Sequence, residues 1–414
     1  MQIKKFLRLL NELKNRPLYL FFIVTVFSCS GKNIEENHNY TISTDPLPAA
    51  YQTHIYFPML EGKRIAFAGN HTSFIDDIHL VDTLLKANIN IVKIFSPEHG
   101  FRGLAAAGEY VDSEVDVKTG LPIISLYGNN RKPKPEHLND VDIILFDIQD
   151  VGARFYTYIS TMTYIMEAAA KLDIPVIILD RPNPNGHFVD GPILEKEFSS
   201  FVGLHPVPIV HGMTIGEYAN MVNYMGWLEN GVQCSLTVIN AVNYTHNSFY
   251  EPPIFPSPNL PNILSIYLYP SLCFFEGTQI SVGRGTEFPF QIYGHSKLPN
   301  NKYSYTFKPE SITSAPNPPQ LDKVCYGINL TTLKIFDIRD DAKINLDYLI
   351  DAYNNFPEKD KFFNNFFNRL AGNNKLQEQI KQGMSADDIR ATWKDELDAF
   401  KLIRKKFLLY PDFE

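Results

Sequence analysis

The sequence predicts an α/β fold with a Rossmann-like, doubly wound parallel sheet and a second, smaller α+β domain. Six apolar runs have the length of buried strands and lie at residues 63–69, 91–96, 121–127, 142–148, 176–179 and 235–239. Three further stretches have apolar residues at helical spacing and lie at 75–87, 158–172 and 214–225. This alternation of strands and helices is typical of a parallel sheet covered by helices.

The pattern changes after about residue 240. Prolines are frequent between Glu251 and Pro319 and helical periodicity is absent there, which predicts extended connections and loops. Ser385 followed by Asp388 approximates a capping box, and it predicts one final helix that continues beyond Trp393. We therefore expect a Rossmann-like domain over residues 53–240 and a smaller domain over 241–414 that closes a cleft.

The first residues have the pattern of an export signal. Basic residues precede an apolar run at 18–27, which ends at Ser28-Cys29. This run is shorter than the ~20 residues of a membrane-spanning helix. We predict a lipoprotein signal over 1–29, lipidation of Cys29 and a flexible tether over 30–52. The alternative is an uncleaved membrane anchor. Either arrangement attaches an exported protein to the cell envelope, and a lipid anchor would face the periplasm or the exterior of a Gram-negative-type outer membrane.

Composition and missing motifs narrow the function. The net charge of −8 gives no reason to expect nucleic acid as a partner. No G-x-G-x-x-G, G-x-x-x-x-G-K-[ST] or G-x-S-x-G motif occurs. Cys234, Cys273 and Cys325 lack the spacing of zinc ligands. We expect no cofactor and no metal, although His71 and nearby acids leave a metal-dependent hydrolase as an alternative.

The chemistry is expected where predicted strands end, because ligands of open parallel sheets bind beyond the carboxyl ends of the strands. Three polar loops follow such ends, at 96–103, 147–156 and 180–186. Carboxylate chemistry fits them, because most glycosidases use a pair of carboxyl groups. Glu98 follows a strand, and Glu109 follows a Gly/Ala-rich loop, so the two could face one cleft.

Several motifs then resemble one known family. They are Ser96-Pro97-Glu98-His99-Gly100, Gly108-Glu109, Phe146-Asp147-Ile148-Gln149-Asp150-Val151-Gly152, Arg154-Phe155-Tyr156, Leu179-Asp180-Arg181-Pro182-Asn183-Pro184, His211-Gly212-Met213-Thr214, Phe275-Glu276-Gly277-Thr278 and Gly283-Arg284-Gly285-Thr286. In this order they resemble the exo-β-N-acetylmuramidases, a glycoside hydrolase family formerly classed as a domain of unknown function. The resemblance covers residues 63 to 411 and implies release of N-acetylmuramic acid from the non-reducing end of peptidoglycan fragments.

The resemblance also implies roles for individual residues. It places the catalytic glutamate on Glu98, and we place the second catalytic group on Glu109. Substrate-binding roles fall on His99, Arg102, Asp147, Gln149, Asp150, Arg154, Tyr156, Asp180, Arg181, Asn183, Glu276, Arg284 and Thr286. Arg102, Arg154 and Arg284 are candidates to grip the lactyl carboxylate of the sugar, and Asp147 or Asp150 could orient its acetamido group. Retaining, inverting and substrate-assisted mechanisms stay open. The competing functions are a metal-dependent amide or ester hydrolase and a lipoprotein that only binds muropeptides.

Overall fold

The computed structural model describes residues 44–97, 100–102 and 114–414. Residues 44–414 form one compact unit. Four residues singled out above lie outside the described residues, namely Cys29, Glu98, His99 and Glu109.

The first sheet has seven strands in the order β5-β6-β4-β1-β7-β8-β9. Their bounds are Ile65–Gly69 (β1), Ile91–Ser96 (β4), Glu114–Val115 (β5), Pro122–Ser125 (β6), Ile143–Asp147 (β7), Val176–Leu179 (β8) and Leu236–Ile239 (β9). All neighbours pair in parallel except β5, which runs antiparallel to β6. Numbered along the chain, the six parallel strands lie in the order 3-2-1-4-5-6, the Rossmann arrangement, so the predicted fold class is confirmed.

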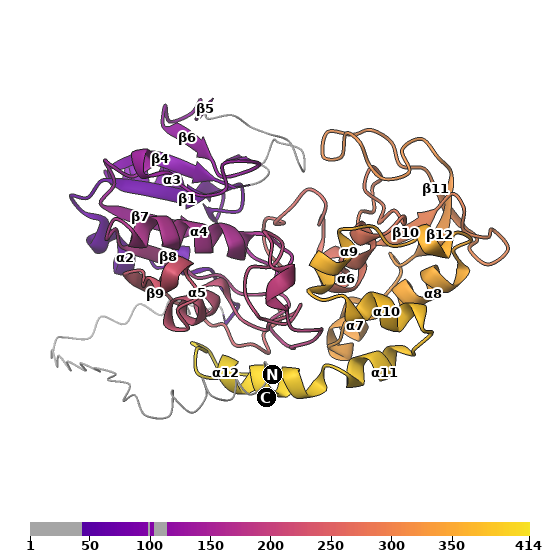
Figure 1. Ribbon diagram of the computed structural model, residues 1–414. Coiled ribbons are helices and arrows are strands. Elements are labelled where there is room, and N and C mark those ends of the chain that lie inside the picture. Colours follow the sequence, from indigo (N-terminus) through magenta and orange to yellow (C-terminus); the bar gives the residue numbers. More distant parts are fainter. Residues whose placement is uncertain (1–43, 98–99, 103–113) are drawn as a thin grey trace, which may run out of the picture. The chain divides into compact units, whose positions relative to one another are not determined.

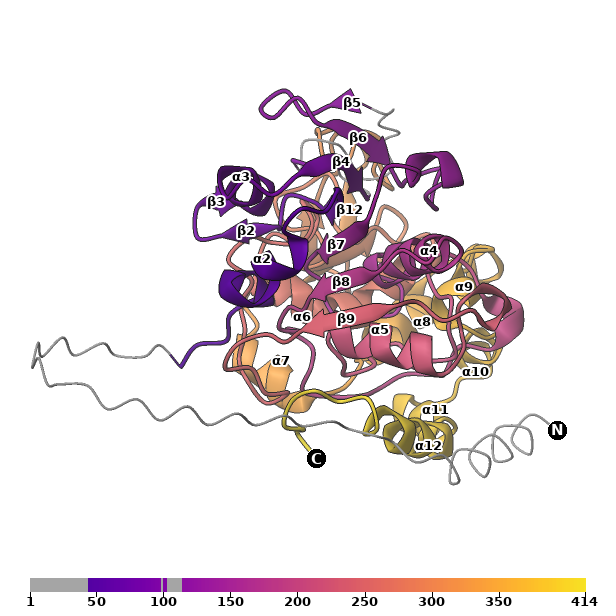
Figure 2. The same cartoon turned by 90° about the vertical axis from the view of Figure 1, so that its left-hand side faces the viewer.

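Helices cover both faces of this sheet. They are α2 (Thr53–Leu60), α3 (Leu80–Lys86), α4 (Tyr158–Ala170) and α5 (Ile215–Tyr224). Figure 1 shows the sheet with its helices, and in Figure 2 α2 and α3 lie on one side of the strands while α4 and α5 lie on the other. Every residue of β1, β7 and β8 is buried, which explains why these strands are continuous apolar runs in the sequence.

The helix predicted at 75–87 is wrong in its first half. Residues Phe74–Ile75 (β2) and Ile78–His79 (β3) form a short antiparallel hairpin, whose turn includes Asp76 at a φ of 49°. The helix α3 starts only at Leu80, because the His79 side chain accepts a hydrogen bond from the backbone N–H of Val81 and caps the helix there.

The second part of the chain contains a three-stranded antiparallel sheet of order β10-β12-β11. The strands of this part are β10 (Ile292–His295), β11 (Tyr305–Phe307) and β12 (Cys325–Asn329). Its α-helices are α6 (Ile263–Leu272), α7 (Ile335–Asp341), α8 (Asp347–Asn355), α9 (Phe367–Ala371), α10 (Lys375–Lys381), α11 (Ala386–Ala391) and α12 (Lys394–Arg404). The prediction that 251–319 holds no helix is wrong, because α6 lies in it. All ten residues of α6 are buried, so the helix has no exposed polar face and gives no amphipathic period.

The two ends of the described chain also differ from the predictions. The predicted cap exists, since Ser385 Oγ accepts a hydrogen bond from the Asp388 N–H, but two helices, α11 and α12, follow it in place of one. Part of the predicted tether is folded, because Leu47 bridges Val242 and Ala49 is fully buried. Folding therefore begins before Thr53.

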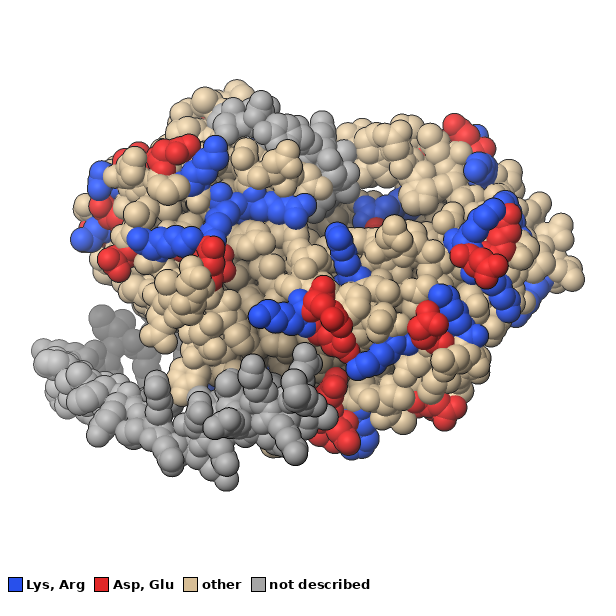
Figure 3. All heavy atoms as spheres, in the orientation of Figure 1, with Lys and Arg blue, Asp and Glu red and all other residues tan. Residues whose placement is uncertain are grey.

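Figure 3 shows Lys and Arg side chains lying among Asp and Glu side chains on the face it draws. Within residues 44–97, 100–102 and 114–414, no helix combines the length and apolar character needed to cross a membrane.

Candidate active site

A cavity of about 330 Å³ lies between loops of the first sheet and the second part of the chain. Tyr127 and Arg131 follow β6, and residues 155–158 follow β7, so the first sheet contributes at its carboxyl edge. The remaining lining residues are Ser200, Phe201, Val202, Ser257, Asn259, Leu260, Tyr269, Glu276, Arg284, Phe290, Phe366 and Arg369. Aromatic faces combined with a few polar groups are typical of a site for a small polar ligand.

Three of the predicted substrate-binding residues line this cavity, namely Tyr156, Glu276 and Arg284. Arg284 Nη2 lies 2.6 Å from Glu276 Oε1, and the Arg284 guanidinium carbon lies 5.3 Å from the centre of the Phe290 ring. The Tyr156 hydroxyl donates to the carbonyl of Pro256 at 2.7 Å. Residues distant in sequence thus meet in one site.

Asp147 and Arg181 form a buried ion pair instead of facing a ligand. Arg181 Nε and Nη2 donate to the two carboxylate oxygens of Asp147 at 2.6 and 2.8 Å. Arg181 is 3% exposed. Asp147 is fully buried, is bonded to Arg181 through both oxygens and is absent from the described cavity lining, so its expected role in orienting an acetamido group finds no support in the structure.

Gln149, Asn183 and Thr286 hold loops together. The Gln149 side-chain amide donates to the carbonyls of Asp150 and Pro182. Asn183 Nδ2 donates to the Met213 carbonyl, and Thr286 Oγ1 donates to the Gly283 carbonyl. These three residues are absent from the cavity lining, so their predicted contact with substrate finds no support in the structure.

Asp180 belongs to a buried network at the start of α5. Its carboxylate accepts hydrogen bonds from Thr214 Oγ1 at 2.6 Å, the Gly216 N–H at 2.8 Å and the Tyr410 hydroxyl at 2.6 Å. Burial raises the pKa of Asp180 to about 6, although the bonds from Thr214 and Tyr410 oppose that rise. Asp180 therefore fastens residue 410 to the first sheet and has no free oxygen for a sugar.

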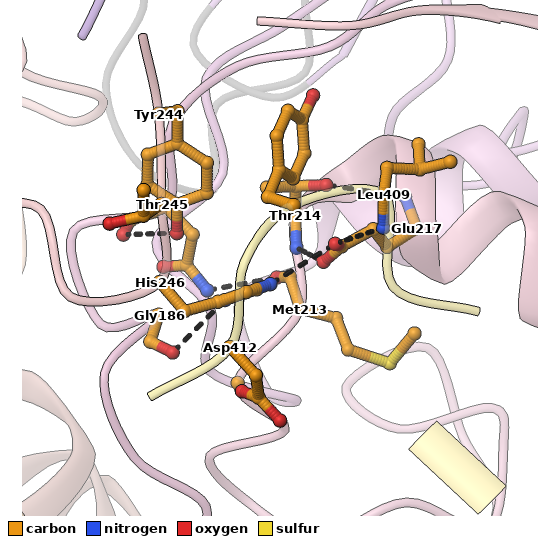
Figure 4. A network of polar contacts seen from close by, with 12 residues as sticks. Gly186, Met213, Thr214, Glu217, Tyr244, Thr245, His246, Leu409 and Asp412 are labelled. Atoms are coloured by element: carbon orange, nitrogen blue, oxygen red, sulfur yellow. Dashed lines mark hydrogen bonds and ion pairs between the residues drawn. The ribbon is translucent and has the colours of Figure 1, made fainter. Parts of the chain in front are cut away.

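Glu217 continues this network (Figure 4). Its Oε1 accepts the Leu409 N–H at 2.8 Å and lies 3.1 Å from His246 Nε2, while Oε2 accepts the Thr214 N–H at 2.9 Å. We call Asp180, Thr214, Glu217, His246 and Tyr410, with the backbone of Leu409, the 409–410 network. It gives Thr214, the last residue of the His-Gly-Met-Thr motif, and the Glu217 that follows a structural role.

Two of the three arginines expected to grip the lactyl carboxylate are engaged elsewhere. Arg102 donates to both carboxylate oxygens of Asp116, and this bond, opposed by burial, lowers the pKa of Asp116 to about 2. Arg154 is fully buried and donates to four backbone carbonyls, those of Pro192, Val207, Leu370 and Ala371. Of the expected trio, only Arg284 lines the cavity.

Asp150 differs from the other buried acids. Its Oδ2 accepts the Gly152 N–H at 2.7 Å, whereas its buried Oδ1 has no hydrogen-bond partner among the described residues. Burial, opposed by the backbone N–H groups of Gly152 and Val151, raises the pKa of Asp150 to about 7. Asp150 lies in the loop after β7 but does not line the cavity. Of the two acids considered for orienting an acetamido group, it is the one with a carboxylate oxygen to spare.

Several lining residues are not predicted from the sequence, among them Arg131, Phe201, Asn259 and Arg369. Arg131 lies six positions beyond the last residue of β6, so the strand-end argument could have found it. Asn259 and Arg369 lie in regions whose fold the sequence does not predict, and no local signal marks them.

His71, considered as a metal ligand, has its Nε2 3.0 Å from the Phe255 carbonyl oxygen. Among the residues that the structure describes, no three His, Cys, Asp or Glu side chains group in a way that could hold a metal ion.

A Rossmann-like sheet with an aromatic and arginine-rich cavity at its carboxyl edge defines an α/β protein that binds a small polar ligand. The family models for the N-terminal and C-terminal parts of exo-β-N-acetylmuramidase NamZ match residues 65–264 and 267–410. The chain therefore belongs to the exo-β-N-acetylmuramidase NamZ family, and the resemblance drawn from its motifs is confirmed.

Similar proteins agree with this assignment. The peptidoglycan β-N-acetylmuramidase NamZ of Bacillus subtilis (strain 168) is 37% identical over 95% of this chain and 97% of its own length. A solved structure of a DUF1343 family protein from Bacteroides fragilis NCTC 9343 is 52% identical, with a TM-score of 0.83 over 89% of this chain and 99% of that one. A second DUF1343 family protein from the same organism is 28% identical, with a TM-score of 0.75 over 89% of this chain and 100% of its own.

Proposed function

We propose that this chain is an exo-acting glycoside hydrolase that releases N-acetylmuramic acid from the non-reducing end of peptidoglycan fragments. The observation that carries the proposal is the 37% identity to a peptidoglycan β-N-acetylmuramidase over almost the full length of both chains. The cavity supports it, because its rings, amide and guanidinium groups suit a sugar that carries a carboxylate.

The proposed chemistry uses carboxyl groups. Glu98, two residues beyond the end of β4, protonates the glycosidic oxygen of the leaving group, and Glu109 acts as the second catalytic group. In a substrate-assisted route, the amide of the sugar attacks the anomeric carbon and an acid orients that amide. Of the two acids considered for this role, Asp147 is bonded to Arg181, and Asp150 has an unpaired Oδ1 but does not line the described cavity, so the orienting acid stays open.

The direct test offers the full chain two chromogenic aryl β-glycosides, one of N-acetylmuramic acid and one of N-acetylglucosamine, with and without a chelator. We expect hydrolysis of the muramic substrate alone, unaffected by chelator. Glu98→Gln should lower kcat about 10²–10⁴-fold, which is the typical loss when a general acid is removed. Glu136→Gln, a change of the same kind at a side chain that is 67% exposed, is the control and should keep full activity.

The outcomes of this assay separate the competing functions. Hydrolysis that stops with chelator would favour a metal-dependent hydrolase. A folded protein that binds muropeptides but cleaves neither glycoside would favour a binding protein. Full activity of Glu98→Gln would remove Glu98 from the mechanism.

We also propose that the chain is exported and lipidated on Cys29. The apolar run at 18–27 followed by Ser28-Cys29 supports this, and Glu35 and Glu36 soon after resemble the surface-export signals of some Gram-negative lipoproteins. Growth with an alkyne-labelled palmitate should label the wild-type protein in the membrane fraction and leave Cys29→Ser unlabelled. Equal labelling of both would contradict the anchor.

A further inference from the structure

Two arginines that none of the family motifs contains line the cavity from opposite parts of the chain. Arg131 lies in the loop after β6, and Arg369 lies on α9. Both side chains are exposed. Among the described residues, neither guanidinium has a hydrogen bond or an ion pair, whereas Arg284 in the same cavity is paired with Glu276.

The charges of the cavity lining are unbalanced among the residues that the structure describes. Its described lining holds three arginines and one glutamate, which leaves a net charge of +2 (3 − 1) in a chain whose net charge is −8. Glu276 compensates Arg284, so the excess charge belongs to Arg131 and Arg369. Within the described lining, two guanidinium groups without a counter-charge favour an anionic ligand.

Arg131 is held in place without using its hydrogen-bond donors. The guanidinium carbon of Arg131 lies 4.4 Å from the centre of the Phe201 ring, and that ring stacks on Tyr164 at 5.9 Å. A guanidinium over an aromatic face keeps its N–H groups free for a second partner.

Arg369 is positioned through its helix. The buried Arg154 donates from Nη2 to the carbonyls of Leu370 and Ala371, both at 2.9 Å, and so fixes the residues next to Arg369. Arg154 thus fixes the backbone of α9 next to Arg369, although Arg154 itself does not line the cavity.

Buried donors without partners point to a ligand in the same place. Asn259 Nδ2 and Ser200 Oγ are buried and have no partner among the described residues, and both residues line the cavity. Asn259 is only 3% exposed. An unpaired buried polar group is costly, so such groups are expected to meet acceptors on a bound molecule.

We infer that Arg131 and Arg369 together hold the carboxylate of the bound sugar and determine the preference for an acidic over a neutral N-acetylated sugar. This inference rests on the proposed function. Arg284 is paired with Glu276. It orients the Glu276 carboxylate and does not supply the charge that discriminates between the two sugars.

The test compares two substrates that differ in one charge, the aryl β-glycoside of N-acetylmuramic acid and its lactyl methyl ester. In the full chain, Arg131→Gln and Arg369→Gln should each lower kcat/KM for the acid about 10–100-fold, mostly through KM, since a hydrogen bond to a charged group is lost. The same variants should change kcat/KM for the ester by less than about 3-fold. Arg369→Lys should recover part of the loss, because it keeps the charge without the forked donors.

Arg64→Gln is the matched control, since Arg64 is 46% exposed and pairs with Asp142 away from the cavity. It should leave both substrates unaffected. Equal losses on acid and ester, or no loss on either, would overturn the inference.

A separate binding measurement distinguishes this inference from the proposed function. If the wild type hydrolyses neither glycoside, the function fails, and calorimetry with free N-acetylmuramic acid and N-acetylglucosamine then tests the inference alone. Binding of the acid that is lost in Arg131→Gln and Arg369→Gln supports it. Equal binding of both sugars by wild type and variants overturns it.

Discussion

The 409–410 network and the cavity both contain polar and charged side chains, but these side chains differ in their hydrogen bonds within the chain. In the network, Asp180 accepts from Thr214 and Tyr410, and Glu217 accepts from Leu409 and Thr214. In the cavity, Asn259 Nδ2 and the guanidinium groups of Arg131 and Arg369 have no hydrogen bond or ion pair among the described residues. The difference is that the acids of the network find their partners within the chain, whereas these polar groups of the cavity do not.

The largest loss of stability is expected where a buried charge would be left alone. Asp147→Ala removes the partner of Arg181, which is 3% exposed, and should lower the free energy of unfolding by about 3–5 kcal/mol. Denaturant unfolding at neutral pH measures it. Asp147→Ala combined with Arg181→Met should recover part of the loss, and a change below about 1 kcal/mol in the single variant would contradict the structural role.

A smaller loss is expected in the 409–410 network. Glu217→Ala leaves the Leu409 N–H and the Thr214 N–H without their acceptor and should cost about 2–3 kcal/mol. Limited proteolysis should then cut near residue 409 faster than in the wild type. Glu217→Gln keeps an acceptor oxygen, so its free energy of unfolding should lie between those of the wild type and Glu217→Ala. Equal free energies of unfolding for the two variants would argue against these bonds.

Asp150 is a buried acid with one unpaired oxygen, so it lies between the fully bonded acids of the 409–410 network and the unpaired groups of the cavity. Its effect is expected in the pH dependence of the free energy of unfolding. Its folded-state pKa of about 7 lies above its ordinary value of 3.8, so the folded protein keeps a proton that the unfolded chain releases. This stabilisation is fully present below about pH 4 and is lost as the pH rises through about 7. Between pH 5 and 8, Asp150→Asn should lose less unfolding free energy than the wild type, by on the order of 2 kcal/mol.

The control for that measurement is Asp395→Asn, an exposed site on α12. It should show the same pH profile as the wild type. A profile of Asp150→Asn that also matches the wild type would mean that Asp150 is ionised in the folded protein throughout this range.

The smallest effect on stability is expected in the cavity. Arg369→Gln removes a side chain that makes no bond to the described residues, so its free energy of unfolding should stay within about 0.5 kcal/mol of the wild type. Thermal and denaturant unfolding measure this change. A large loss would show that Arg369 stabilises the fold, and it would weaken the contrast with the 409–410 network.

The sequence predicts the first sheet well because its central strands are buried on both faces and therefore read as continuous apolar runs. It misses α6 for a related reason, since a helix buried on all sides shows no amphipathic period. At the site, motifs predict polar residues at strand ends but not their partners. Asp147 and Arg181 lie 34 positions apart, and only the fold shows that they neutralise each other.

The bond between Tyr410 and Asp180 spans 230 positions, and it sets an order of events during synthesis. When the ribosome has completed the strands of the first sheet, the Asp180 carboxylate still lacks one of its donors, and the Ala241 N–H still lacks the Tyr410 oxygen that it later binds. These hydrogen bonds of the first sheet therefore form only after synthesis of a segment that lies more than 150 positions beyond Ala241. A prematurely terminated chain would leave such polar groups without partners. We therefore expect proteases to degrade a truncated chain before it binds substrate in place of the full-length protein.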